Sequence, residues 1–121
     1  LNHMTEFNPS FYQHFRGNFY LAYGVGQYCS SSEDDVFFAK ALHHESLNQV
    51  KIYSNKEKTG FKIEGIDRPG LDFVLYQELY GDGKFWVREV DSFMGEKVLD
   101  SGESVQRFKY LGLEIPTVLR M

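Results

Sequence analysis

The chain has 121 residues, of which 42% are hydrophobic, a net charge of −4 at neutral pH and one cysteine, Cys29. This length predicts one domain with a self-sufficient core, and a single cysteine excludes a scaffold held together by intrachain disulfides. The mild acidic excess argues against a large positively charged surface that would bind nucleic acid or an anionic membrane. The apolar runs are too short to span a bilayer, so we expect a cytoplasmic protein that does not insert into a membrane.

The composition favours β-strands. Aromatic residues make up 17% of the chain, which is typical of strands, and 11 glycines supply the turns that many short strands need. Residues 1–4 resemble a cloning remnant, so we expect a single domain over residues 5–121.

The first expected element follows a polar lead-in at residues 5–14. A glycine turn at residues 17–18 leads into a strand from residue 19, because inward and outward side chains alternate from that point. Gly24 and Gly26 are expected to end this strand or to bulge it.

The middle of the chain predicts a loop, two strands and a long excursion. Residues 29–35 are small, polar and acidic, as loops are. Residues 36–44 fit the spacing of a strand or a helix, and their β-branched and aromatic start favours a strand. Residues 49–54 alternate as a strand. Residues 55–70 are charged and interrupted by glycines, so we expect an excursion that includes a short strand at residues 61–63.

Two alternating strands at residues 73–90 surround a Gly-Asp-Gly turn at residues 81–83. A three-residue loop with Gly83 in the left-handed conformation places the apolar side chains on one face. A two-residue loop mixes apolar and charged side chains on both faces, so the first register is preferred. That register pairs Tyr80 with Lys84, Glu78 with Trp86, and Tyr76 with Arg88.

The remaining elements are a helical turn at residues 91–96 and a last strand at residues 105–111. Many short strands, glycine turns and one short helical turn predict an all-β fold, either a barrel or a sandwich. The small size of the domain favours a small barrel.

One face of the hairpin combines aromatic side chains with arginine, at Tyr76, Tyr80, Trp86 and Arg88. Packing of this face as a partly buried layer beneath residues 54–72 is favoured, because burial is the usual fate of Trp and Tyr. The alternative is a recognition surface, since these residue types are enriched in binding hot spots.

Three arginines, Arg16, Arg88 and Arg107, would converge if their strands are neighbours in a small barrel. Separate ion pairs with the carboxylates of Glu78 or Glu89 are the favoured interpretation. The alternative is a site for a small anion or for a peptide carboxylate.

The sequence His43-His44-Glu45 resembles a group of metal ligands. Neighbouring residues on a strand point to opposite faces, so we expect neither a metal site nor a cofactor here. Cys29 and the serines at residues 30–32 lack the surroundings of a catalytic nucleophile. Glu78 and Glu89 are expected on opposite faces of the hairpin, which argues against a cooperating acid–base pair.

Three blocks of sequence resemble a bacterial family known as domain of unknown function 1653. The blocks are "YQHFRGNFY" near the start, "VLYQELYG" with "WVREVDSF" in the hairpin region, and "RF" in the last strand. The resemblance implies an SH3-like small barrel and no established activity. This chain departs from the family in extra residues near 27–40 and 54–72, and in Glu89, which stands where the family has proline.

These observations lead to three hypotheses about function. The first is a noncatalytic binding or adaptor module that uses the aromatic and arginine face, together with His14 and Arg16, to bind a protein or peptide partner. The second is a protein or enzyme that binds a small anion or metabolite around Arg16, Arg88 and His14. The third, disfavoured by the acidic charge, is a weak nucleic-acid binder.

Overall fold

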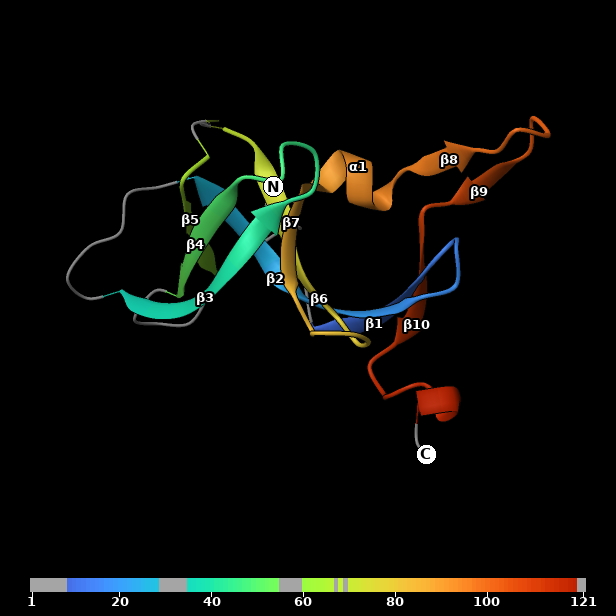
Figure 1. The fold of residues 1–121 in the computed structure, drawn as a ribbon, viewed down its shortest axis with the longest axis horizontal. Helices are drawn as coiled ribbons and strands as arrows, with labels where there is room; N and C mark the ends of the chain where they lie inside the picture. Colours follow the sequence, from blue (N-terminus) through green and yellow to red (C-terminus); the bar gives the residue numbers. More distant parts are fainter. Residues whose placement is uncertain (1–8, 29–34, 55–59, 67, 69, 120–121) are drawn as a thin grey trace.

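The computed structural model describes residues 9–28, 35–54, 60–66, 68 and 70–119 (Figure 1). The expected remnant at residues 1–4 and most of the expected loop at residues 29–35 lie outside these ranges. The elements of the described residues are β1 (Ser10–His14), β2 (Phe19–Tyr28), β3 (Val36–His43), β4 (Gln49–Ser54), β5 (Phe61–Glu64), β6 (Asp72–Glu78), β7 (Phe85–Glu89), α1 (Val90–Met94), β8 (Glu96–Val98), β9 (Ser104–Gln106), β10 (Phe108–Gly112) and the 3-10 helix η2 (Thr117–Leu119).

The central feature is a closed barrel whose strands follow the order β2, β5, β4, β3, β7, β6 and return to β2. The pairs β2–β5 and β3–β7 are parallel, and the other neighbours in the ring are antiparallel. The expectation of a small all-β barrel is therefore confirmed. No helix of the described residues is long and apolar enough to cross a bilayer.

Strand β2 pairs with three other strands of the eight-stranded sheet. Its first half pairs with β1, its second half pairs with β5, and its other edge pairs with β6 along most of its length. The register against β6 shifts between Ala22 and Gly24, so the expected glycine irregularity is a bulge and the strand continues to Tyr28. This bulge marks the point where β2 leaves the barrel to join β1 and β10.

The prediction of a polar lead-in is wrong for residues 10–14, which form β1 between β2 and β10. Ser10 and Tyr12 are buried on one face, while Phe11 and Gln13 are only partly covered. The alternation of apolar and polar side chains that predicts a strand is absent from this segment, because one of its buried positions is a serine.

The expected excursion at residues 55–70 also needs correction. Residues 61–64 form β5, a strand of the barrel wall between β4 and β2, and Ile63 is fully buried. The predicted short strand is confirmed, but it belongs to the barrel and not to an insertion. Residues 55–59, 67 and 69 lie outside the described residues.

Two cores lie on opposite faces of β6. Phe73 and Leu75 point into the barrel with Val87 and residues of β3, β4 and β5, whereas Val74 and Tyr76 point outward into a second cluster. That outer cluster consists of Tyr12, Ala22, Val74, Tyr76, Phe93 and Phe108. A strand buried on both faces explains the continuous apolar run in β6.

The hairpin register differs from the preferred prediction by two residues. Tyr76 pairs with Trp86 and Val74 with Arg88, and a backbone hydrogen bond links Glu78 N–H to the carbonyl of Lys84. The connection is longer because Gly81 and Gly83 both have positive φ, 54° and 69°. Side chains alternate with a period of two, so a register shift of two residues leaves every side chain on the same face of the hairpin. The predicted division into an apolar face and an amphipathic face is therefore correct.

The C-terminal region adds a hairpin that the sequence did not predict. The expected helical turn is α1, but the expected last strand is split into β9 and β10 at Arg107. The side chain of Arg107 donates to the carbonyls of Ser92 and Glu96, and its backbone N–H donates to the carbonyl of Gly95. The β8–β9 hairpin consequently extends away from the barrel (Figure 1).

Candidate functional site

A pocket of about 220 Å³ lies on the outer face of the β6–β7 hairpin. The end of β1, the start of β2, the turn after β3 and the start of β10 complete its walls. Its lining residues are His14, Tyr20, His44, Tyr76, Tyr80, Trp86, Arg88 and Phe108.

Five of the six residues singled out from the sequence line this pocket. Tyr76 is 4% exposed and therefore forms the floor instead of a free surface. Trp86 and Arg88 are half-buried, and Tyr80 is exposed at the rim. The sixth residue, Arg16, is exposed outside the lining, with its guanidinium 5.4 Å from the ring centre of Phe15.

Tyr76 is packed in a buried layer, as the favoured interpretation predicted. The elements that cover it are not the expected residues 54–72. Phe93 of α1 and Phe108 of β10 pack on Tyr76, with ring centres 5.2 and 5.3 Å away. Residues of β1 and β2 complete the cluster. The described part of residues 54–72 contributes to the barrel core instead.

Tyrosine rings form one wall of the pocket. The ring of Tyr20 meets those of Tyr76, Tyr80 and Phe108 edge-on, each with centres 5.5 Å apart. The hydroxyls of Tyr20 and Tyr80 are 2.6 Å apart. Burial, followed by the hydrogen bond to Tyr80, raises the pKa of Tyr20, so Tyr20 keeps its proton. One hydroxyl of the pair donates to the other, which leaves one O–H donor at the rim.

The indole of Trp86 is held in a fixed orientation. Its Nε1–H donates to Glu78 Oε2 at 2.8 Å, and Glu78 Oε1 accepts the backbone N–H of Lys84 at 3.2 Å. Both carboxylate oxygens of Glu78 therefore accept hydrogen bonds from within the hairpin.

Arg88 supplies the positive charge of the pocket. Its guanidinium lies 5.4 Å from the ring centre of Phe108, and its Nη2 donates to Nδ1 of His44 at 3.0 Å. Its Nε is buried without a hydrogen-bond partner. Among the described residues, no carboxylate lies within 4.0 Å of this guanidinium.

The favoured expectation that Arg16, Arg88 and Arg107 form ion pairs with carboxylates is therefore wrong among the described residues. Glu89 lies on the other face of the hairpin, where it pairs with His43, His44 and Arg68. Arg107 is engaged with main-chain carbonyls. Burial, with a further contribution from the charge of Arg107, lowers the pKa of Arg88. The pocket thus concentrates positive charge without a matching acid.

The positive charges around the pocket also change the pKa of His14. Burial, followed by the charges of Arg88, Arg16 and Arg107, lowers its pKa from 6.5 to about 4. Its Nδ1 accepts the backbone N–H of Arg16 at 3.2 Å, which fits a neutral imidazole. All three arginines named from the sequence therefore lie near enough to His14 to lower its pKa, although only Arg88 lines the pocket.

This pKa predicts a pH dependence of stability. The unfolded chain binds the His14 proton near pH 6.5 and the folded chain only near pH 4, so folding stability falls as the pH is lowered through this window. We expect thermal melting curves of the wild type to lose stability relative to His14→Gln between pH 6.5 and 4. Melting temperatures that stay a constant distance apart over this range would contradict the prediction.

The sequence missed three lining residues. Tyr20 and Phe108 were read as ordinary strand residues, because their meeting depends on the pairing of β1 with both β2 and β10. His44 was considered only as a metal ligand. The argument that His43 and His44 point apart fails because β3 ends at His43, and both imidazoles reach Glu89.

Comparison with known proteins identifies a family model that matches part of the chain. The model of a family described as "Protein of unknown function (DUF1653)" matches residues 68–110. This range includes β6, β7 and α1, and it supplies Tyr76, Tyr80, Trp86, Arg88 and Phe108 to the pocket. Neither the curated proteins nor the solved structures gave a match.

Proposed function

We propose that this chain, whose residues 68–110 match the model of the DUF1653 family of unknown function, is a noncatalytic binding module whose pocket receives a carboxylate group of a peptide partner. The observation that carries this proposal is the guanidinium of Arg88, half-buried among aromatic rings with no carboxylate within 4.0 Å among the described residues. Arginine is the side chain best suited to hold a carboxylate through two parallel hydrogen bonds.

The electrostatics of the pocket support an anionic ligand. A buried Nε with no partner leaves one donor of Arg88 unsatisfied, and a buried donor without a partner is unfavourable until something accepts from it. One hydroxyl of the Tyr20–Tyr80 pair donates to the other, so the pair offers one further O–H that can donate to a ligand oxygen. A carboxylate at this position would satisfy all of these donors.

The size of the pocket supports a group of a larger partner over a complete metabolite. A volume of about 220 Å³ lies below the roughly 300–1,000 Å³ of sites that enclose drug-sized ligands. A second cavity, of about 480 Å³, shares His14 with the pocket and is lined in part by Phe15, Leu99 and Val105. A peptide with its carboxylate at Arg88 can place apolar side chains in this second cavity.

Trp86 makes the proposal testable without a label, because it is the single tryptophan of the chain and lines the pocket. The titration uses N-acetylated, tryptophan-free tripeptides of randomised sequence with a free carboxyl end, and the same tripeptides with an amidated end. We expect the free acids to change Trp86 emission and to protect it from acrylamide quenching. The amides should have no comparable effect.

The matched variants are Arg88→Gln and Arg16→Gln, which remove the same charge inside and outside the pocket. A charge-assisted hydrogen bond is worth about 1.5–3 kcal/mol, so Arg88→Gln should weaken the binding of free acids about 10- to 100-fold. Arg16→Gln should change it far less. Equal losses in both variants would indicate general electrostatic attraction, and equal binding of acids and amides would refute the carboxylate. Binding of acetate or phosphate as tight as that of the tripeptides would favour the small-anion alternative.

A further inference from the structure

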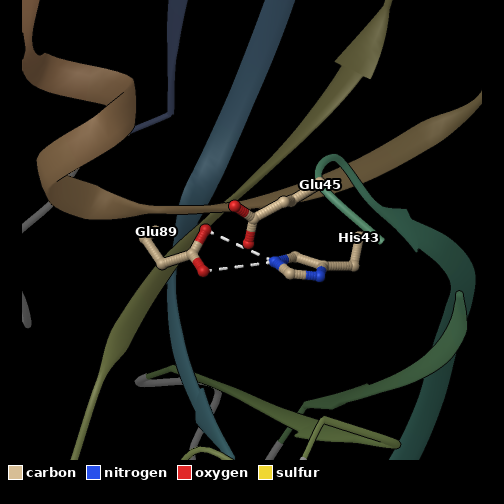
Figure 2. A group of neighbouring side chains, drawn as sticks. All are labelled: His43, Glu45 and Glu89. Atoms are coloured by element: carbon tan, nitrogen blue, oxygen red, sulfur yellow. Dashed lines mark hydrogen bonds and ion pairs between the residues drawn. The ribbon is translucent and has the colours of Figure 1, made fainter. Parts of the chain in front are cut away.

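A second group of polar side chains lies at the end of the barrel where β3 and β7 finish. These strands are parallel neighbours, with Leu42 opposite Trp86 and His43 opposite Val87, so their carboxyl ends reach the same edge. His43 ends β3 and Glu89 ends β7, while Glu45 follows in the turn after β3. Figure 2 shows the imidazole of His43 directed toward the carboxylate of Glu89, with the carboxylate of Glu45 beside them.

The donor atoms of this group lie close enough together to be drawn onto one metal ion by small side-chain movements. Nε2 of His43 lies 3.3 and 3.2 Å from the two carboxylate oxygens of Glu89, and one donor atom from each of the three residues lies within 4.8 Å of the others. Ligands about 2.0–2.2 Å from a tetrahedral zinc ion are about 3.3–3.6 Å apart. The His43–Glu89 separation already falls at the lower edge of this range.

The surroundings of His43 orient its ring for such a role. The residue is 2% exposed, and its Nδ1 lies 2.9 Å from Oγ of Ser46. That Oγ also accepts the backbone N–H of Asn48 at 3.2 Å, which fixes its position. A hydrogen bond from Nδ1–H to a neighbouring oxygen is the usual support of a metal-binding histidine, because it presents Nε2 as a lone pair.

Arg68 is the charge that now balances the two carboxylates. Its guanidinium lies 3.5 Å from Glu89 and 3.9 Å from Glu45, and its side chain is about half exposed. Exposed pairs of this length contribute little to stability, about 0–1 kcal/mol, so a divalent ion can displace the guanidinium. A cavity of about 170 Å³ adjoins His43, Ser46 and Arg68 and offers room for the water that completes the shell.

We propose that His43, Glu45 and Glu89 bind one divalent transition-metal ion of the zinc class, with water in the remaining coordination position. One imidazole nitrogen and two carboxylate oxygens suit Zn²⁺, which accepts nitrogen and oxygen donors together. This site is separate from the carboxylate pocket, since Glu89 faces away from Tyr76 and Trp86, and it does not depend on the proposed function.

The test measures zinc binding by the full chain after treatment with a chelator, by competition with a chromophoric zinc indicator. We expect one zinc ion per chain bound by all three residues, and a rise in melting temperature with added zinc. Glu45 is exposed, so Glu45→Gln should leave the fold intact while weakening zinc binding at least tenfold. Glu103→Gln is the matched control, because Glu103 is exposed on the remote β8–β9 hairpin, and it should not change the affinity.

Arg68→Gln gives an opposite prediction that a merely structural role would not produce. Removal of the competing guanidinium should tighten zinc binding several-fold. Absence of stoichiometric binding by the wild type would overturn the proposal. So would binding that is unchanged in both Glu45→Gln and His43→Gln, because the ion would then sit elsewhere on the chain.

Discussion

Replacement of Phe93 by alanine is expected to lower the free energy of unfolding by about 3–5 kcal/mol, the range observed for large aromatic side chains removed from well-packed cores. Phe93 is fully buried and stacks on Phe108, with ring centres 4.2 Å apart and planes 8° from parallel. It also meets Tyr12 and Tyr76 with ring centres 5.0 and 5.2 Å away. The substitution therefore opens a cavity at the centre of the outer core.

Chemical denaturation followed by circular dichroism measures this loss. Phe93→Leu is the matched control, because it retains much of the buried volume and should cost clearly less. Tyr76 and Phe108 also line the pocket, so Phe93→Ala should loosen its floor and increase quenching of Trp86 by acrylamide. A loss below about 1 kcal/mol would show that α1 does not seal the outer core.

Gly26→Ala is the second substitution with a large expected effect, a destabilisation of about 1–3 kcal/mol through overpacking. An added Cβ would lie 2.9 Å from the backbone oxygen of Phe61 and 3.0 Å from its Cβ. Gly26 pairs with Phe61 in the parallel β2–β5 contact and with Phe73 on the other side. Relief of the clash must therefore separate two strands of the closed barrel.

Gly60→Ala provides the comparison for this experiment. Gly60 directly precedes β5, but the nearest atom to an added Cβ there is the carbonyl oxygen of Val25 at 3.9 Å. The unfolding midpoint of Gly60→Ala should be equal to that of the wild type or slightly higher, since alanine restricts the unfolded chain. If Gly26→Ala and Gly60→Ala melt alike, the close contact of β2 with β5 is not a constraint on this barrel.

Local patterns were sufficient for much of the fold. The alternation in β4, the aromatic start of β3 and the glycine turn between β6 and β7 each predicted the correct element, because short-range periodicity determines which face is buried. Strand β1 was missed because Ser10, although buried, is polar. The hairpin register was missed because two glycines adopt positive φ where one was expected.

The candidate pocket was predicted only in part, for a related reason. Tyr76, Trp86 and Arg88 share a face through the period of two along one hairpin, which the sequence displays directly. Tyr20, His44 and Phe108 come from three other elements, and only the pairing of distant strands brings them to this face. The proximity of Glu89 to both histidines was missed likewise, since it depends on the parallel β3–β7 pair.

The closed ring also has a consequence for synthesis of the chain. When the ribosome has released β2 to β5, β2 and β3 still expose the backbone edges that β6 and β7 will occupy. Pairing between such distant segments gives a high contact order, so we expect slow folding that begins only after residue 89 has emerged. Until then, the unpaired edges are available to other strands, and nascent chains truncated before β6 should aggregate or recruit chaperones.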